Sequence, residues 1–493
     1  MRTRSPASHQ GSPALDLSPR LGRRAFCTGL AVTILALAQN AAAEARARPD
    51  AADDQPGPRP KGGASPVRLR AAPQAWPLKA GAATGLWCFE EMSPGPILRL
   101  RRGSELAVHL ENGLAQPTSL HWHGLRIANA RDGVGGLTQQ PVAPGATQEI
   151  RFTPRDAGTF WYRPLVPAHA AEQTERGLSG LLIIEEDEPP AVDADLVMVI
   201  DDWALDDNNQ LRPGFGTREE GGLAGRLGNW LTVNSAAAPE KLTVAPGAQL
   251  RLRLLNATNA RPVTLRFEGL AVQVVAIDGQ PADPFAPAGD RLAMLPGSRC
   301  DLMVRCPTTA GASAAVVAAL GQGFPLLAVA TEGASSPLAG SPVPVLPDNS
   351  LPQAIDLAAA VRADLVLTGG LDPAAPGPGG ASAADSSRLW QVNGIAWPDA
   401  AKPLLTVKQG RPVVLSLTNR TAQLQAMHLH GHSARLLHAL DDGWEPYWVD
   451  TIAVPIGRTV RVAFVAEAPG KWMIGSSILD RLGAGLAAWF EVT

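Results

Sequence analysis

The chain has 493 residues, which is enough for roughly three domains of about 150 residues each. Its formal charge is −3, from 43 basic and 46 acidic residues. Nucleic-acid binders normally carry a basic surface, so we expect no nucleic-acid partner. Glycine (49) and proline (44) together make up nearly a fifth of the sequence, which favours short strands and turns over long helices.

The first 43 residues (1–43) have the pattern of an export signal. Arg23 and Arg24 precede an apolar run at 30–38, and three alanines follow at 41–43. The run is too short to anchor the chain in a membrane, so we expect no membrane span after signal cleavage. The paired arginines and Phe26 favour the twin-arginine route, and an ordinary secretory signal with two adjacent arginines is the alternative. We expect a periplasmic location.

Residues 44–65 are rich in alanine, proline, arginine and glycine and have no apolar period. Such a segment buries too little apolar surface to fold, and we predict a disordered tether. Strand-like alternation begins near Val67.

Four cysteines occur, and Cys27 leaves with the signal. The remaining three, Cys88, Cys300 and Cys306, are an odd number, so at least one thiol is unpaired. Cys300 and Cys306 are expected on one strand, where six residues span about 20 Å, which is too far for a disulfide. We interpret all three as packing residues.

The chain repeats an internal spacing three times. The glycines at 103, 247 and 410 are each followed nine residues later by an asparagine (112, 256 and 419). Nine residues after each asparagine stand His121, Leu265 and His428. Each glycine opens an alternating segment that ends on its asparagine, which is typical of a turn followed by a strand. A generic hairpin rhythm would not preserve both intervals, so the spacing predicts three related units.

Two turn-rich segments (185–195 and 332–352) separate the three units, and a further loop at 369–387 lies inside the third. We therefore predict units at 66–188, 191–340 and 354–493. Their β-rich pattern, with turn signals every 8–12 residues, is typical of β-sandwiches.

Two of the three units carry His-x-His at the repeated position: His121 and His123, and His428 and His430. Residues two apart on a strand point to the same face, about 6.6 Å apart at Cα, while Trp122 and Leu429 would point into the core. Imidazole suits copper and zinc. Two pairs at equivalent positions predict a site where the first and third units meet.

These motifs give the chain a resemblance to the multicopper oxidases, which include laccases and cuprous oxidases. The resemblance covers nearly all of the mature sequence and implies an all-β fold of three tandem cupredoxin-like Greek-key β-sandwich domains. In that family, four histidine-bearing motifs build a type 1 copper and a trinuclear cluster between the first and third domains. The supporting segments are PGPILRLRRG (94–103), TSLHWHGLR (118–126), GTFWY (158–162), RGLSGLLIIEE (176–186), VVAIDGQP (274–281) and MHLHGH (427–432).

The sequence departs from the family pattern at most ligand positions. His121, His123, His428 and His430 are retained, and His121 and His428 match the type 2 ligands. The second motif, normally His-x-His, reads Arg163-Pro164-Leu165. The remaining type 1 and type 3 positions that the resemblance assigns are occupied by Gln425, Gly475, Ser476, Ser477, Arg481 and Leu486.

A type 1 copper needs a thiolate and two imidazoles, which Ser476, Gln425 and Arg481 cannot replace. We therefore expect neither the full four-copper complement nor oxygen reduction by the family mechanism. The four remaining histidines could bind one copper or zinc ion, or form a neutral, hydrogen-bonded relic. Arg163 and Arg481, if they lie where the ligands did, would replace the charge of the lost metal.

The other histidines match no ligand of the family. His109 is expected to face solvent, and His432 and His438 are expected outside the site. His169 is interpreted as a loop residue, although it could instead reach the site in place of a lost ligand.

The leading hypothesis is a non-catalytic periplasmic scaffold or binding protein with an envelope protein as partner. The resemblance includes a precedent, a copper-free, twin-arginine-exported cell-division protein, but this chain differs from it in keeping both His-x-His pairs. The alternatives are a residual mononuclear copper or zinc protein and a copper-dependent oxidoreductase of laccase type.

Overall fold

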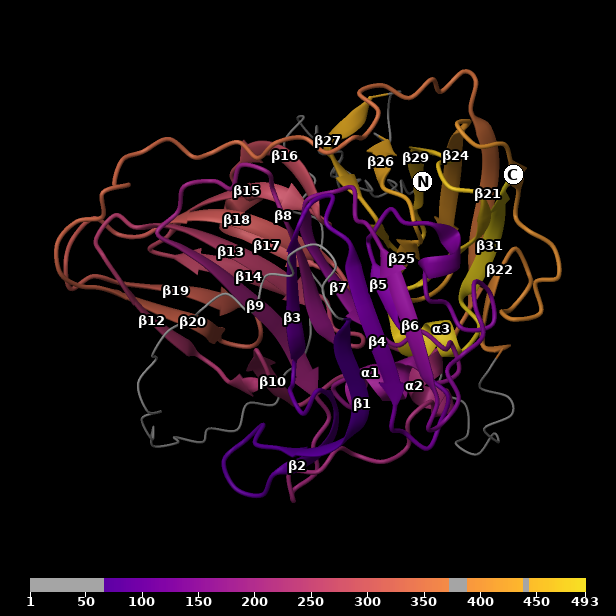
Figure 1. The fold of residues 1–493 in the computed structure, drawn as a ribbon, viewed down its shortest axis with the longest axis horizontal. Helices are drawn as coiled ribbons and strands as arrows, with labels where there is room; N and C mark the ends of the chain where they lie inside the picture. The colour runs from indigo at the N-terminus through magenta and orange to yellow at the C-terminus, as the bar shows by residue number, and fades with distance from the viewer. Residues whose placement is uncertain (1–65, 372–387, 438–442) are drawn as a thin grey trace, which may run out of the picture.

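The computed structural model describes residues 66–371, 388–437 and 443–493. These residues form mostly β-strands and loops, in three units that follow one another along the chain (Figure 1). The predicted signal, the predicted tether, His438 and most of the loop at 369–387 lie outside the described residues. Among the described residues, helices with the length and apolarity needed to cross a membrane are absent.

The first unit consists of two four-stranded sheets. One has the order β2 (Thr84–Phe89), β1 (Val67–Trp76), β4 (Leu106–Asn112), β6 (Thr147–Phe152). The other has the order β3 (Gly95–Arg101), β8 (Gly180–Glu185), β7 (Gly158–Arg163), β5 (His121–His123).

The second unit has a seven-stranded and a five-stranded sheet. The larger has the order β11 (Ala236–Ala237), β10 (Trp230–Val233), β9 (Ala194–Trp203), β13 (Gln249–Asn256), β18 (Arg299–Arg305), β15 (Ala271–Ile277), β16 (Gln280–Phe285). The smaller has the order β12 (Glu240–Val244), β20 (Phe324–Thr331), β19 (Ser313–Ala318), β14 (Val263–Glu268), β17 (Arg291–Met294).

The third unit has a six-stranded and a five-stranded sheet. The six-stranded sheet has the order β22 (Trp390–Val392), β21 (Val361–Gly369), β24 (Pro412–Asn419), β29 (Thr459–Val465), β26 (Ala434–Leu437), β27 (Trp444–Val449). The five-stranded sheet has the order β23 (Thr406–Val407), β31 (Ala487–Val492), β30 (Gly470–Ser476), β25 (Gln425–Leu429), β28 (Thr451–Val454).

The repeated asparagines have the same structural role in all three units. Asn112, Asn256 and Asn419 end strands β4, β13 and β24. In each case the amide nitrogen donates to two main-chain carbonyls, at 2.8–3.0 Å, and the amide oxygen accepts from the main-chain N–H two residues further on. A buried amide that satisfies its donors and acceptor in this way closes the loop after the strand. The sequence spacing therefore reflects a repeated piece of structure.

Strands β4, β13 and β24 also pair in parallel with the first long strand of their own unit, β1, β9 and β21. Parallel neighbours need a crossover connection, which is how each unit forms two layers instead of a simple meander. The fold is all-β with three cupredoxin-like units, as the sequence predicted.

The hydrophobic core of the first unit continues into that of the third, while the second unit has its own. Trp122 and Leu429, the central residues of the two His-x-His motifs, are fully buried in the shared core, as predicted. Cys88 packs in a smaller cluster beside the second unit, and Cys300 and Cys306 pack in the core of the second unit. These positions confirm the thiols as packing residues.

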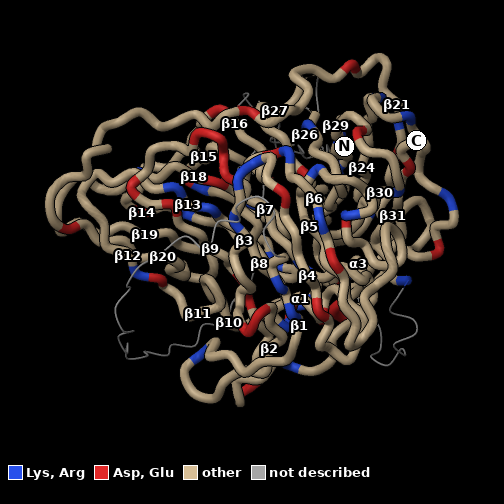
Figure 2. The backbone as a smooth tube through the Cα atoms, viewed as in Figure 1, with Lys and Arg blue, Asp and Glu red and all other residues tan. Residues whose placement is uncertain are grey.

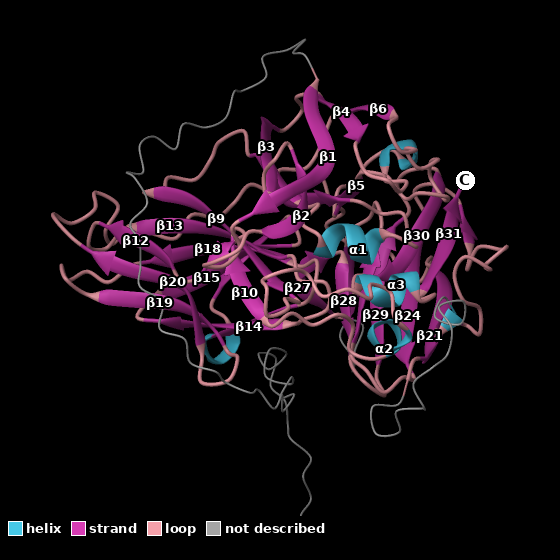
Figure 3. Ribbon diagram, turned by 90° about the horizontal axis from the view of Figure 1, so that it is seen from below, coloured by secondary structure: helices cyan, strands magenta, loops and turns pink. Residues whose placement is uncertain are grey.

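Three short helices gather where the units meet. α1 (Ala170–Glu175) and α2 (Arg218–Gly222) both contact α3 (Leu479–Gly483), and Figure 3 shows the three side by side. Two 3-10 turns complete the helical content of the described chain, η1 (Asn129–Arg131) and η2 (Ala288–Asp290). Basic and acidic positions are interspersed along the backbone (Figure 2).

Candidate metal centre

Strands β5 and β25 bring the two His-x-His pairs together between the first and third units. The ring centroids of His121 and His430 lie 4.4 Å apart, and those of His428 and His430 lie 4.5 Å apart. The rings of His123 and His428 stack at 3.6 Å with an interplanar angle of 15°. The structure therefore brings these four histidines together, as the sequence predicted.

Asp132 orients two of the four imidazoles. It follows the turn η1, and its main-chain carbonyl accepts a hydrogen bond from His121 Nδ1 at 2.6 Å. Its carboxylate Oδ2 accepts from His430 Nδ1 at 3.0 Å. A carbonyl can only accept, so Nδ1 of His121 carries the proton and Nε2 presents a lone pair. A carboxylate or carbonyl that fixes the tautomer in this way is the usual outer shell of a metal-binding histidine.

Asp450 has the same function on the opposite side. It lies between β27 and β28, and its main-chain carbonyl accepts from His428 Nδ1 at 3.1 Å. Its carboxylate lies 3.5 Å from His123 Nε2 and accepts from the Thr451 hydroxyl at 2.9 Å. His428 Nε2 therefore also presents a lone pair toward the other rings.

The second unit braces Asp450. Arg299, at the start of β18, donates to both oxygens of Asp450, at 3.0 and 2.5 Å. Asp278 accepts from the main-chain N–H groups of Asp450 and Thr451, each at 3.0 Å. A Cβ on Gly124, whose φ is +89°, would lie 2.0 Å from Arg299 Nη2, so only glycine leaves room for this arginine. The site between the first and third units is therefore held in place by the second unit.

Burial keeps the imidazoles of His121, His123 and His428 neutral. It lowers the pKa of His121 to about 4 and the pKa of His428 to about 3. It also holds the pKa of His123 well below its usual value. Nε2 of His121, Nε2 of His428 and Nδ1 of His123 are buried and have no hydrogen-bond partner among the described residues. Neutral imidazoles with free lone pairs are the form that a metal ion requires.

Two overlapping sets of side chains have metal-ligand spacing. One ring nitrogen each from His121, His428 and His430 lie within 4.8 Å of one another. The second set consists of His123, His428 and Asp450, with the same limit. The first set could hold one ion with three imidazoles, and His123 belongs to the neighbouring set.

Known protein families and solved structures match this chain over most of its length. Three family models described as multicopper oxidase match residues 71–189, 194–322 and 372–493. The crystal structure of a multi-copper oxidase from Pseudomonas thermotolerans is 30% identical with a TM-score of 0.77, and the alignment covers 88% of this chain and 100% of that chain. The chain belongs to the multicopper oxidase family.

Other relatives agree. A multi-copper oxidase structure from Pseudomonas parafulva is 31% identical with a TM-score of 0.75, covering 87% of this chain and 100% of that one. The multicopper oxidase MmcO of Mycobacterium tuberculosis is 28% identical over 414 residues, covering 77% of this chain and 78% of its own. The family binds copper, and the histidine cluster is a possible metal-binding group of this chain.

Arg163 ends β7, at a position that the family resemblance assigns to a histidine of the second motif. It pairs directly with His121 across β5 and β7, so both side chains lie on the same face of the sheet. The side chain is buried, its guanidinium lies 5.0 Å from the centre of the Trp161 ring, and burial lowers its pKa to about 9. The sequence-based hypothesis placed an arginine charge beside the histidines, and Arg163 has that position.

Arg481 lies elsewhere, in a second buried polar region. Its Nη1 donates to the side-chain oxygen of Gln425 at 2.8 Å and to the carbonyl of Leu424 at 2.6 Å. Gln425 in turn donates to the Thr421 hydroxyl at 2.9 Å. The hydroxyl of Ser476 accepts from the main-chain N–H of Ile478 at 3.1 Å. We call Gln425, Ser476 and Arg481 the closed region, since their polar groups bond to one another and to the main chain.

Among the described residues, the other histidines belong to neither set of potential ligands. His432 is buried, with Nδ1 bonded to the His430 carbonyl at 2.9 Å and Nε2 accepting from the Glu467 N–H at 3.2 Å. His109 lies on β4, part exposed and 3.8 Å from Glu111. His169 directly precedes α1 and is half-buried.

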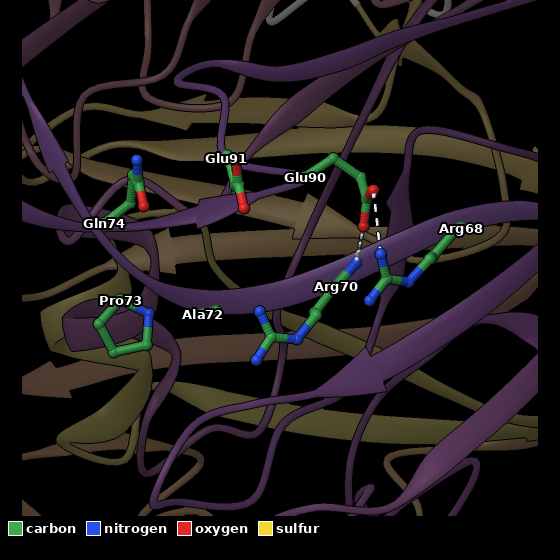
Figure 4. Close-up of a pocket in the computed structure, with 7 residues that line it drawn as sticks. All are labelled: Arg68, Arg70, Ala72, Pro73, Gln74, Glu90 and Glu91. Carbon is green, nitrogen blue, oxygen red and sulfur yellow. Dashed lines mark hydrogen bonds and ion pairs between the residues drawn. The ribbon is translucent and has the colours of Figure 1, made fainter.

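A surface pocket lies apart from these strands, on the first sheet of the first unit. It is lined by residues of β1 and by the two glutamates after β2, and Glu90 accepts from the Arg70 N–H at 2.7 Å (Figure 4). Arg68 lies 3.8 Å from the same carboxylate. Of its charged side chains, Arg68 and Glu90 are paired with each other.

Sequence reasoning missed the residues that orient the cluster: Asp132, Asp450, Arg299 and Asp278. Their separations from the histidines along the chain are as large as 327 residues (450 − 123), for Asp450 and His123. The only local signal is Asp132 beside Gly133, whose φ is +87° and whose Cβ would meet the Leu120 carbonyl at 2.0 Å. That pair marks a tight turn but says nothing about a histidine partner.

Proposed function

We propose that this chain is an exported multicopper-oxidase homologue that holds a single copper or zinc ion and does not carry out the family's four-electron oxygen reduction. The observation that carries the proposal is the contrast between two regions. Three buried imidazoles converge with free lone pairs, whereas the closed region presents no free ligand.

The residues present fit one ion. His121, His428 and His430 each use Nδ1 for a hydrogen bond to Asp132 or Asp450, which leaves Nε2 for a metal. Three imidazoles suit both copper and zinc, and a bound ion would supply Lewis-acid or one-electron chemistry at that point. The chain's own contribution is to hold the three rings in one tautomer within a buried interface.

The residues of the closed region do not fit a type 1 copper. Ser476 offers a neutral hydroxyl in place of a thiolate, and Arg481 is a cation whose donors are occupied by Gln425 and carbonyl groups. Without that copper, a reducing substrate has no electron entry point into the cluster. The family mechanism therefore has no first step in this chain.

Metal analysis of the protein purified after copper and zinc loading tests the proposal. We expect about one equivalent of either metal and no blue thiolate-to-copper absorption. A blue colour, or close to four coppers per chain, would overturn the claim that type 1 chemistry is lost. His121→Ala and His428→Ala are the matching ligand variants.

A non-catalytic scaffold is the second candidate, and the hydrogen-bonded closed region favours it, because this part of the former site is stabilised without any cofactor. It predicts less than about a tenth of an equivalent of metal in the same measurement. It also predicts a periplasmic location, reached by twin-arginine export, and an envelope protein partner. Proximity labelling in cells tests this, and the absence of a reproducible envelope partner would count against it.

A further inference from the structure

Arg163 is a buried cation without a counter-charge. It is 1% exposed, and its Nε and Nη1 are buried without a hydrogen-bond partner among the described residues. Other buried arginines of this chain lie against carboxylates, as Arg299 does with Asp450 and Arg251 with Asp301. Arg481 instead donates to carbonyl and amide oxygens. Burying a guanidinium with no acceptor is costly, so this position calls for a partner from outside the chain.

The guanidinium lies on the histidine side of its sheet. Arg163 pairs with His121 and Trp161 pairs with His123 in the β5–β7 register, so all four side chains share one face. The guanidinium leans back over the Trp161 ring, 5.0 Å from its centre, and that ring lies 5.2 Å from the His123 ring. The guanidinium donors that have no partner therefore lie on the same face of the sheet as His121 and His123.

Two kinds of unmet bonding capacity thus occur on one face of this sheet. The imidazoles offer lone pairs, which require a cation or a hydrogen-bond donor. Arg163 offers N–H groups, which require an acceptor, preferably an anion. A metal ion alone would meet the first requirement and place a second positive charge beside the guanidinium. An anion alone would meet the second requirement and face the imidazole lone pairs.

The charges around the cluster favour the binding of a metal ion together with an anion. Asp450 and Asp278 share Arg299, so this trio leaves at most one negative charge, and Asp132 supplies one more to offset a divalent ion. A divalent ion beside Arg163 then leaves an excess of positive charge in a buried interface. A bridging water satisfies the hydrogen bonds but not this charge, whereas a small anion satisfies both.

We propose that Arg163 forms an anion subsite, in which a small monovalent anion bridges its guanidinium to the metal ion held by His121, His428 and His430. The inference rests on the proposed single-metal function. In this proposal the site binds a metal ion and an anion together, so each of them raises the affinity for the other.

Calorimetric titration of zinc into the metal-free full-length protein tests the subsite. Sodium perchlorate at fixed ionic strength is the reference, and chloride, azide and formate replace it in turn, which separates halide, linear and carboxylate anions. We expect at least one of the three to tighten zinc binding by roughly tenfold. Arg163→Met should lose this dependence, with less than about a twofold difference between salts, because the guanidinium carries the coupling.

Arg481→Met is the matched control, because it removes another buried arginine whose donors are already occupied, and it should respond to anions as the unsubstituted protein does. Arg163→Gln, which is neutral but keeps hydrogen-bond donors, provides a second test if the methionine variant does not fold. Zinc binding that is independent of anions, or anion dependence that survives in the Arg163 variants, overturns the subsite and leaves the single-metal function intact. Failure of zinc to bind in every salt overturns the subsite, and failure of copper to bind as well overturns the single-metal function.

Discussion

The histidine cluster and the closed region share strand β25 but meet their bonding requirements in opposite ways. Gln425 and His428 are three residues apart on this strand, so their side chains leave it on opposite faces. Around Gln425, the polar groups named above bond to one another or to the main chain. Around His428, two Nε2 atoms and one Nδ1 atom have no partner among the described residues.

The difference shows how buried polar residues can be interpreted. Buried polar groups are normally hydrogen-bonded, and exceptions need an explanation such as a bound ion or water. The closed region needs no such explanation, although it occupies positions where the family resemblance implies copper ligands. The histidine cluster needs one, and its ordered tautomers indicate a cation. The following predictions test this contrast, from the largest expected effect to the smallest.

Removal of the arginine that braces the cluster should have the largest effect on stability. Arg299→Met leaves Asp450 and Asp278 buried without their cation. Breaking a buried pair in this way typically costs about 3–5 kcal/mol in the free energy of unfolding. Denaturant unfolding of the metal-free protein measures it. The control, Arg388→Ala, removes an exposed pair with Asp399 and should leave the midpoint unchanged. Equal midpoints for the two variants would remove the structural role assigned to the second unit.

Removal of a central histidine should abolish metal binding. His428 belongs to both sets of potential ligands. We expect His428→Ala to weaken zinc or copper binding by more than about a hundredfold, beyond the usual cost of losing an outer-shell partner. The comparison variant is Gln425→Ala on the same strand, which should bind metal normally but lose about 1–3 kcal/mol of stability, since it leaves Arg481 short of an acceptor. Metal loss in both variants would mean that the two regions are not independent.

The outer carboxylate of the cluster should have a smaller effect. Asp132→Asn keeps the shape but removes the charge that holds His430, and a change of this kind typically costs about 10–100-fold in metal affinity. Competition against a chelator of known affinity measures it. Asp480→Asn is the counterpart beside the closed region, and it should leave the metal affinity unaltered. The assignment of Asp132 as an orienting residue fails if both variants bind alike.

The smallest expected effect is a pH dependence beside the closed region. Burial raises the pKa of Glu175 to about 8, despite the nearby Arg226, and it also raises the pKa of Asp201. Between pH 6.5 and 8 the unfolded state has already lost these protons while the folded state keeps them. The stability of the metal-free protein should therefore fall as pH rises, by up to about 1.4 kcal/mol per pH unit for each such group. Unfolding curves of Glu175→Gln should show a shallower slope, and an unchanged slope would exclude Glu175 as a source.

The sequence by itself determined the three related units and the common face of the two histidines in each His-x-His pair. Both follow from local chemistry that repeats: a turn glycine, a strand ending on an asparagine, and a residue nine positions later. The alternation along each strand also placed Trp122 and Leu429 in the core and left the flanking histidines on the other face. These are properties of a single strand and its turn, so a single segment of sequence contains them.

Only the tertiary structure decided which polar groups are satisfied. Asp132, Asp450 and Arg299 reach the histidines from separate segments of the chain, and no spacing in the sequence links them. The tertiary structure also decided the partners of Arg163 and Arg481. Arg481 finds its acceptors in Leu223, Leu424 and Gln425, whereas Arg163 lies beside the cluster with unpartnered donors. A hydrogen bond depends on distances of a few ångströms between segments far apart in sequence, and only the folded chain sets those distances.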